Sequence, residues 1–173
     1  PISSTPLTLG WSVGGGARAL TLPAGIAGVS RSHCTLESRD GQSVVADHST
    51  PEGRDRLLVA CPEPDILVIT CSPPKFTADY REVTIEDWQQ ALSTGMLGPI
   101  ELMKGVIEGM RARKWGRIVN IMTLAAREPM HFRLLSGPPR SALANFTVAM
   151  ARPLAKDNVI LNNILPGMHH TGG

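Results

Sequence analysis

The sequence predicts an α/β domain built around a parallel sheet with helical crossovers. Residues 117–122 and 159–164 are short apolar runs typical of buried strands, and the segment 139–156 between them predicts a helix. A strand, a helix and a strand in this order leave no room for a hairpin, so the two strands are expected to run parallel. Residues 65–70, DILVIT, are continuously apolar, as a strand covered on both faces should be.

The composition fits a single domain spanning residues 1–173. The chain is 42% hydrophobic and 18% charged, and its net charge is only +2. Such a small, scattered charge argues against nucleic acid or an anionic membrane as partner. The absence of a long apolar run and of a signal-peptide layout predicts a cytoplasmic protein. The cysteines lack metal-binding spacing, so no metal is expected.

Residues 1–23 form the irregular part of the expected domain. Three adjacent glycines, of which Gly14 and Gly16 are the candidate cofactor contacts, follow an apolar segment. They are either a phosphate-binding turn or a flexible loop, because the cluster lacks the usual spacing of glycines in such turns. Residues 17–22 predict a helix of only six residues, because Pro23 ends it.

Residues 24–30 and 43–47 are the next two strands expected in the parallel sheet. The helix expected after them covers residues 50–61. Thr50 is its predicted N-cap, and Pro51 occupies the first helical position, where a missing amide hydrogen costs nothing.

Residues 84–113 carry the strongest helix pattern. Apolar side chains recur there at steps of three to four residues. Thr84 and Asp87 approximate a capping box at the start, and Pro99 is expected to kink the helix.

The motifs GRIVNI, SALANF and NNILPG resemble those of the short-chain dehydrogenase/reductase family. The similarity extends roughly over residues 26–171. It implies a Rossmann-like fold, in which helices cover a doubly wound parallel sheet in three αβα layers. It also implies a small-molecule carbonyl or alcohol substrate and hydride transfer with NAD or NADP. It also implies homo-oligomers formed through helices 84–113 and 139–156. Compared with the family, the chain ends before the last helix and strand, so a C-terminally truncated domain is expected.

The resemblance places the catalytic residues at Thr123, Ser136 and Arg140. The family has Ser, Tyr and Lys there, at the same spacings of thirteen and four residues. A fourth catalytic residue, Asn in the family, falls on Gly95. A serine hydroxyl is far less acidic than a tyrosine hydroxyl, and an arginine stays charged and cannot pass a proton on. Thr123 either replaces the family's serine as a hydroxyl donor or satisfies nearby backbone.

The same resemblance assigns the remaining cofactor contacts. Arg31, just past a strand, favours NADP because guanidinium pairs with a 2′-phosphate, although a solvated surface role is as well supported. Asp47 is expected near the adenine, and Thr171 is expected to contact the cofactor after the Pro-Gly turn. Three histidines also fall near the expected site, namely His131, His169 and His170. Histidine can carry a proton near neutral pH, so these residues are either loop residues or proton donors to the substrate.

Two alternatives to an active oxidoreductase remain open. Four substitutions at one site, of which only Thr123 is conservative, favour a non-catalytic relative that serves binding or assembly, namely Gly95, Thr123, Ser136 and Arg140. Such a relative need not bind a nucleotide. The poor glycine motif and an arginine at this spacing resemble halohydrin-dehalogenase-like lyases, which retain a tyrosine where this chain has Ser136. The pair Pro138 and Pro139 predicts an extended backbone before a helix beginning near residue 139, so that Ser136 need not face Arg140.

Overall fold

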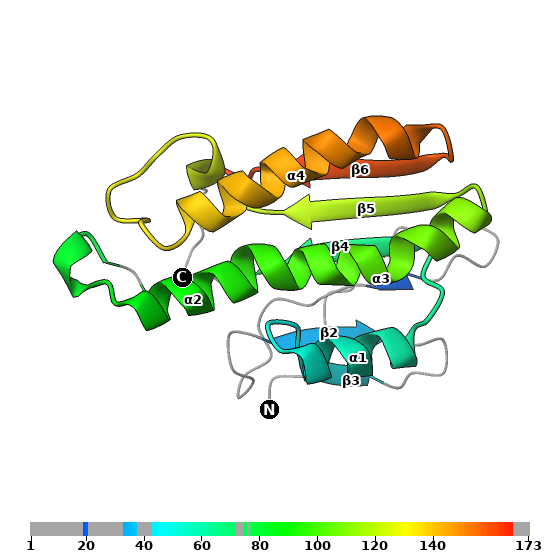
Figure 1. Ribbon diagram of the computed structural model, residues 1–173, viewed down its shortest axis with the longest axis horizontal. Coiled ribbons are helices and arrows are strands. Elements are labelled where there is room, and N and C mark those ends of the chain that lie inside the picture. Colours follow the sequence, from blue (N-terminus) through cyan, green and yellow to red (C-terminus); the bar gives the residue numbers. More distant parts are fainter. Residues whose placement is uncertain (1–18, 21–32, 38–42, 72–74, 76, 168–173) are drawn as a thin grey trace, which may run out of the picture.

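The computed structural model describes residues 19–20, 33–37, 43–71, 75 and 77–167. A four-stranded sheet in the order β1-β4-β5-β6 forms its centre, and every neighbouring pair is parallel. The strands are β1 Ala19–Leu20, β4 Ile66–Thr70, β5 Gly116–Ile121 and β6 Val159–Ile164. The α/β class, the parallel sheet and the strand-helix-strand unit at its centre are therefore confirmed (Figure 1).

The main helices form one layer (Figure 1). They are α1 Pro51–Ala60, α2 Ile85–Leu92, α3 Gly98–Ala112 and α4 Gly137–Ala155. In this layer α3 and α4 lie over the sheet, α2 precedes α3, and α1 packs beside α3. A π-helical turn, η2 Ser93–Leu97, joins α2 to α3. Short 3₁₀ turns lie at η1 Tyr80–Glu82 and η3 Leu124–Ala126. Within the described ranges, no helix has the length and apolar character that crossing a bilayer requires.

The predicted starts of α1 and α2 are confirmed. Thr50 caps α1, accepting a hydrogen bond from the Gly53 amide at 3.1 Å. Thr84 and Asp87 form a complete capping box at α2, in which each side chain accepts from the other residue's amide. The segment expected as one helix is divided by the π-helical turn, and Pro99 lies in the first turn of α3. The kink expected at Pro99 stays a prediction.

The strand expected at residues 43–47 forms, but not in the parallel sheet. β3 Ser43–Asp47 pairs antiparallel with β2 His33–Glu37 in a separate two-stranded sheet. Only five residues separate β2 from β3, which suits a hairpin, whereas a parallel crossover needs about a dozen. The expectation that residues 43–47 form a parallel strand is therefore wrong.

The short helix expected at residues 17–22 is also wrong where the structure describes it, because Ala19 and Leu20 form β1 beside β4. The strand expected at residues 24–30 lies outside the described residues. So do several of the candidate site residues, namely Gly14, Gly16, Arg31, Thr171, His169 and His170.

Helix α4 begins earlier than the two prolines predict. Gly137 and Pro138 are helical rather than extended, and Ser136 is the N-cap. The first turn of a helix tolerates proline because its amides have no helical partner, and glycine before a proline has no Cβ to clash. Gly137 also lies so close to η3 that an added Cβ would come within 2.8 Å of the Ala125 carbonyl oxygen.

The core lies between the sheet and its helical layer. Its fully buried side chains include Leu67, Ile69, Leu102, Met103, Met110 and Ile118. A buried amide in β5 fixes α4 over the sheet. Asn120 donates to the Thr147 hydroxyl of α4 at 3.0 Å and to the Asn163 side-chain oxygen of β6 at 3.1 Å.

Charged groups cluster at the amino ends of β5 and β6. The Asp157 carboxylate accepts hydrogen bonds from Lys114 at 2.6 Å and from Arg111 at 2.8 Å. These two hydrogen bonds lower the pKa of Asp157 to about 2. The cluster joins the end of α3 to the turn between α4 and β6.

Candidate functional site

The carboxyl ends of β5 and β6 are held together just beyond the sheet. The Met122 amide donates to the Ile164 carbonyl at 2.8 Å, and the Leu124 amide donates to the Pro166 carbonyl at 3.2 Å. Thr123 lies between these bonds, and its hydroxyl accepts from the Ala125 amide at 3.4 Å as the cap of η3. The Thr123 hydroxyl thus satisfies local backbone at the edge where the site was expected.

Ser136 and Arg140 are in direct contact, which the two prolines had left open. Arg140 Nη1 donates to Ser136 Oγ at 3.1 Å and to the Ser136 carbonyl at 3.2 Å, and Nη2 donates to the Cys71 carbonyl at 3.0 Å. Both side chains are deeply buried, at 4% exposure each. Because α4 starts at Gly137, its N-cap Ser136 lies one turn before Arg140. The guanidinium therefore bridges the start of α4 and the end of β4.

Gly95 leaves the room in which this guanidinium lies. It is buried in the π-helical turn, and a Cβ added there would lie 3.1 Å from Pro139 Cβ and 3.7 Å from Arg140 Nη1. A longer polar side chain at this position would compete with the guanidinium for space. The small residue at 95 and the large cation at 140 are thus geometrically complementary.

Three further polar residues join this cluster. His48 Nε2 lies 3.1 Å from the Thr94 carbonyl oxygen and 3.7 Å from Cys71 Sγ. His48 follows β3 directly and is 1% exposed. The contact spans 46 residues of sequence, so local patterns give no sign of it. The sequence does indicate that the helix near Thr94 lacks a backbone donor, because Pro99, five residues later, has no amide hydrogen. It does not indicate that His48 supplies one.

Burial governs the ionisation of this cluster. It lowers the pKa of the Arg140 guanidinium and of the His48 imidazole from their ordinary values. Burial also raises the pKa of the Cys71 thiol to about 11, although the nearby Arg140 opposes the shift. The thiol is therefore protonated at neutral pH and is not an activated nucleophile.

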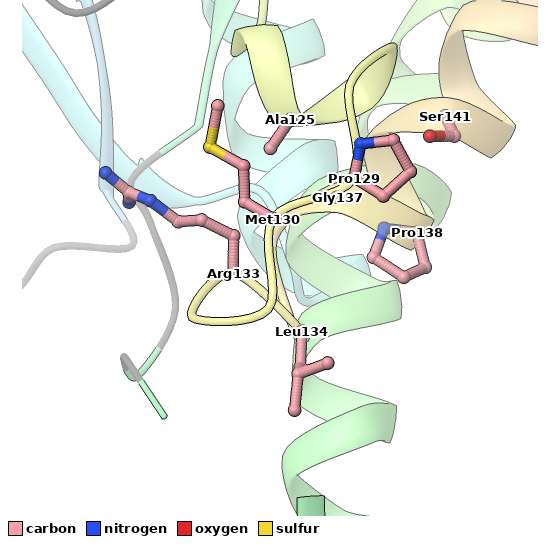
Figure 2. A pocket seen from close by; sticks show the side chains of 8 residues that line it. All are labelled: Ala125, Pro129, Met130, Arg133, Leu134, Gly137, Pro138 and Ser141. Carbon is pink, nitrogen blue, oxygen red and sulfur yellow. The ribbon is translucent and has the colours of Figure 1, made fainter. Parts of the chain in front are cut away.

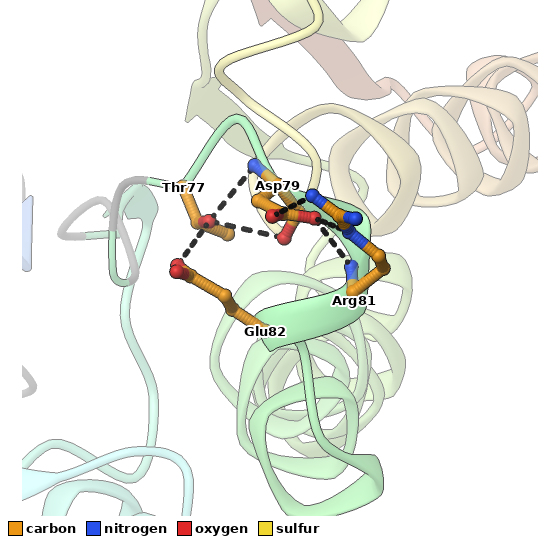
Figure 3. Close-up of polar contacts among 4 residues, drawn as sticks. All are labelled: Thr77, Asp79, Arg81 and Glu82. Atoms are coloured by element: carbon orange, nitrogen blue, oxygen red, sulfur yellow. Dashed lines mark hydrogen bonds and ion pairs between the residues drawn. The ribbon is translucent and has the colours of Figure 1, made fainter.

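Two loops pair to form a rim beside the site. Thr77, after β4, forms a parallel bridge with Arg133, which lies between η3 and α4. The Thr77 hydroxyl accepts from the Asp79 amide at 3.2 Å and lies 3.3 Å from a Glu82 carboxylate oxygen (Figure 3). The Asp79 carboxylate in turn binds the side chain of Arg81. These bonds fix the shape of the loop after β4.

A small hollow of about 150 Å³ opens next to the first turn of α4. Figure 2 shows that its walls come from η3, the following loop and the start of α4. Its lining is mostly apolar and consists of Ala125, Pro129, Met130, Arg133, Leu134, Gly137, Pro138 and Ser141. His131 lies in the same loop and is exposed.

Asp47, the candidate adenine contact, ends β3 and is half-buried. Its carboxylate accepts from the Ser49 amide at 2.9 Å and so shapes the turn into α1. Its role toward a cofactor stays a prediction. Among the residues placed by the structure, no group of three His, Cys, Asp or Glu side chains is arranged to hold a metal ion.

His48 should make stability depend on pH. Its folded-state pKa lies below the ordinary value of 6.5 because burial outweighs the opposing effects of the Thr94 carbonyl and Asp47, and Arg54 lowers it further. As the pH falls below 6.5, the imidazole binds a proton in the unfolded chain but not yet in the folded one. The free energy of unfolding therefore decreases as the pH falls, until the folded-state pKa of His48 is reached. Between about pH 7.5 and about pH 5.5, wild type should therefore lose more stability than His48→Gln, whose side chain does not titrate in this range. Urea unfolding at both pH values measures this, and equal losses would contradict it.

A parallel sheet with a polar cluster beyond its carboxyl ends is the arrangement of doubly wound α/β proteins that bind nucleotides. The profile of the short chain dehydrogenase family matches residues 55–173. The chain therefore belongs to the short chain dehydrogenase family, and the fold class and family expected from the sequence are confirmed.

Individual relatives agree with this assignment. Acetoacetyl-CoA reductase of Cupriavidus necator is 30% identical over 124 residues, which cover 71% of this chain and 50% of the relative. The solved structure of L-sorbose reductase from Gluconobacter frateurii, complexed with NADPH and L-sorbose, is 28% identical with a TM-score of 0.65 and covers 70% of this chain and 48% of that one. A 3-oxoacyl (acyl-carrier-protein) reductase from Agrobacterium tumefaciens with NADP bound has a TM-score of 0.63 at 27% identity, covering 72% and 47%. The matched region thus spans about half the length of these relatives.

Proposed function

We propose that this chain provides the cofactor-binding and catalytic portion of an NADP-dependent oxidoreductase that acts on a small carbonyl or hydroxyl substrate. The observation that carries the proposal is the family match over residues 55–173 together with the polar cluster at the carboxyl edge of the sheet. Relatives of the same fold are complexed with NADPH or NADP. The parallel β4-β5-β6 arrangement supports the same use here.

The residues present fit the sugar and nicotinamide end of such a cofactor. Hydroxyl and guanidinium donors, Thr123 and Arg140, lie on elements that meet at the carboxyl edge, where parallel sheets hold dinucleotides. We assign the other contacts to Gly14 and Gly16 for the pyrophosphate, and to Arg31, Asp47 and Thr171, as the family resemblance implies. When bound, NADPH supplies the hydride for reduction of a carbonyl.

The chain's own residues can orient a substrate better than they can protonate it. Ser136 Oγ is held by Arg140 at 3.1 Å, so its position is fixed, but an aliphatic hydroxyl is a weak acid. Arg140 contributes positive charge that stabilises an oxygen developing negative charge, and it keeps its own proton. We therefore expect slow turnover in which solvent delivers the proton.

A second function, nucleotide binding without turnover, is favoured by a specific observation. Both terminal nitrogens of Arg140 donate to the protein itself, and Ser136 is 4% exposed. Such a cluster serves as a structural brace even when no substrate reaches it. Binding and assembly would then be the chain's task.

One experiment separates these functions. The purified chain is titrated with NADPH by calorimetry and is then assayed at 340 nm with acetoacetyl-CoA as the probe substrate. Binding with turnover supports the oxidoreductase, and binding without turnover supports the second function. If NADPH does not bind, both proposals fail; halide release from a vicinal haloalcohol without nucleotide would instead identify a dehalogenase-like lyase.

Arg31→Ala tests the proposed preference for NADP. Removing a charge-assisted contact to the 2′-phosphate should weaken NADPH binding by about 10-fold to 100-fold. NADH lacks that phosphate, so its affinity should stay unchanged. Calorimetry with both nucleotides measures the difference, and equal effects on the two would place Arg31 away from the phosphate.

Exposed apolar side chains support a homo-oligomer formed through α2-α3 and α4. Leu97 is 50% exposed and Val148 is 70% exposed. The variant Leu97→Asp/Val148→Asp should shift the protein toward monomer in size-exclusion chromatography with light scattering, because charge opposes burial in an interface. Val59→Asp on α1, where the side chain is 80% exposed, is the matched control and should leave the mass unchanged. Identical masses for all three proteins would refute this interface.

A further inference from the structure

The helix that passes the candidate site lacks one backbone donor. At the end of the π-helical turn the Gly98 amide donates to the Ser93 carbonyl, five residues back. In an α-helix that amide would have served Thr94, and the next residue, Pro99, has no amide hydrogen. The carbonyl of the buried residue Thr94 therefore needs a donor from elsewhere, because leaving a buried carbonyl without a hydrogen bond is unfavourable.

His48 supplies this donor from another part of the fold. Its Nε2 lies 3.1 Å from the Thr94 carbonyl oxygen. A carbonyl oxygen only accepts, so the ring must carry its proton on Nε2. The backbone of His48 is itself fixed, because its carbonyl accepts from Arg54 Nη1 of α1 at 2.9 Å.

The turn that His48 holds forms one wall of the Arg140 cluster. Thr94 precedes Gly95, and a Cβ at Gly95 would lie 3.7 Å from Arg140 Nη1. On the other side of the guanidinium, the Cys71 carbonyl accepts from Nη2, while the Cys71 thiol faces His48 Nε2 at 3.7 Å. A shift of the turn would therefore expose both the Arg140 guanidinium and the Cys71 thiol to solvent.

We propose that His48 is a positioning residue of the candidate site, whose Nε2–H replaces the missing Pro99 amide and so holds the π-helical turn against Arg140. The imidazole touches neither a substrate nor a cofactor in this role. It acts through Thr94 and Gly95 on the shape of the space around Arg140.

The test uses Cys71 as a local probe in a Cys34→Ser/Cys61→Ser background, in which it is the sole thiol. His48→Leu removes the donor, whereas His48→Gln keeps an amide N–H at similar reach. We expect Ellman's reagent to label Cys71 at least about 10-fold faster in His48→Leu, which corresponds to a lost hydrogen bond worth about 1.4 kcal/mol. In His48→Gln the rate should stay within about 3-fold of the parent. Leu154→Ala, a buried change on α4 far along the chain from this turn, controls for general destabilisation and should leave the labelling rate unchanged.

Equal labelling of His48→Leu and the parent would overturn the proposal, as would the same acceleration in His48→Gln or in Leu154→Ala. If His48→Leu does not fold, His48→Asn, whose amide is too short to reach Thr94, takes its place with the same expected acceleration. The NADPH affinity of each variant is a second measurement, which rests on the proposed function. Failure of NADPH to bind any variant would count against that function, whereas the thiol rates decide the role of His48.

Discussion

Arg140→Ala is expected to lower the free energy of unfolding by roughly 3 kcal/mol. The guanidinium serves three acceptors at once, namely the Cys71 carbonyl, the Ser136 carbonyl and Ser136 Oγ. Alanine leaves these groups without that donor and opens a cavity between β4 and α4. Urea unfolding monitored by circular dichroism measures the loss, and NADPH calorimetry should show weaker binding for the same reason.

Two variants make this expectation specific. Arg140→Lys keeps the positive charge, but a single ammonium cannot span Ser136 and Cys71 in the way a planar guanidinium does, so an intermediate loss is expected. Arg81→Ala removes an arginine whose side chain is 75% exposed and paired with Asp79, and it should have no measurable effect on stability. If the urea midpoint of Arg140→Ala equals that of the wild type, the hydrogen bonds of Arg140 to Cys71 and Ser136 do not contribute to stability.

Gly98→Ala should destabilise the protein by about 2–3 kcal/mol, although alanine is normally the better helix former. A Cβ at position 98 would come within 2.5 Å of the His48 carbonyl oxygen and 2.9 Å of the Ser93 carbonyl oxygen. Both are backbone atoms, so the π-helical turn or the β3–α1 connection must shift. Differential scanning calorimetry and urea unfolding both report the change.

Gly109→Ala is the matched control in the same helix. Its added Cβ would meet only the end of the Arg113 side chain, at 3.2 Å, which can move aside. The substitution should stabilise the protein by about 0.5–1 kcal/mol through helix propensity. If both glycine variants are stabilised alike, the close packing of His48 against Gly98 is not a constraint.

Local sequence signals predicted the elements whose ends are set by neighbouring residues. The Thr50 cap, the Thr84 capping box and the apolar strands β4, β5 and β6 all follow from residues a few positions apart. Strand pairing is not local in this way, so residues 43–47 were placed in the wrong sheet. The start of α4 was missed because contact with η3 and the tolerance of a first helical turn outweighed the preference of residues before proline.

Only those residues of the candidate site that occupy positions of the family motif could be predicted from the sequence. Spacing pointed to Ser136 and Arg140, and the structure brings them together. Nothing in the sequence near Arg140 indicates that Cys71, His48 and Thr94 complete the cluster. Those residues converge from β4, the end of β3 and the π-helical turn, and only the folded chain juxtaposes them.

The ion cluster of Asp157 with Arg111 and Lys114 lies at the far end of the strands from Arg140. It fastens the connections entering β5 and β6 without help from any residue of the candidate site. The two ends of these strands are thereby held by separate sets of side chains. A substitution that loosens the Arg140 cluster should therefore leave the opposite ends of β5 and β6 fastened, so local damage at one end of these strands need not spread to the other.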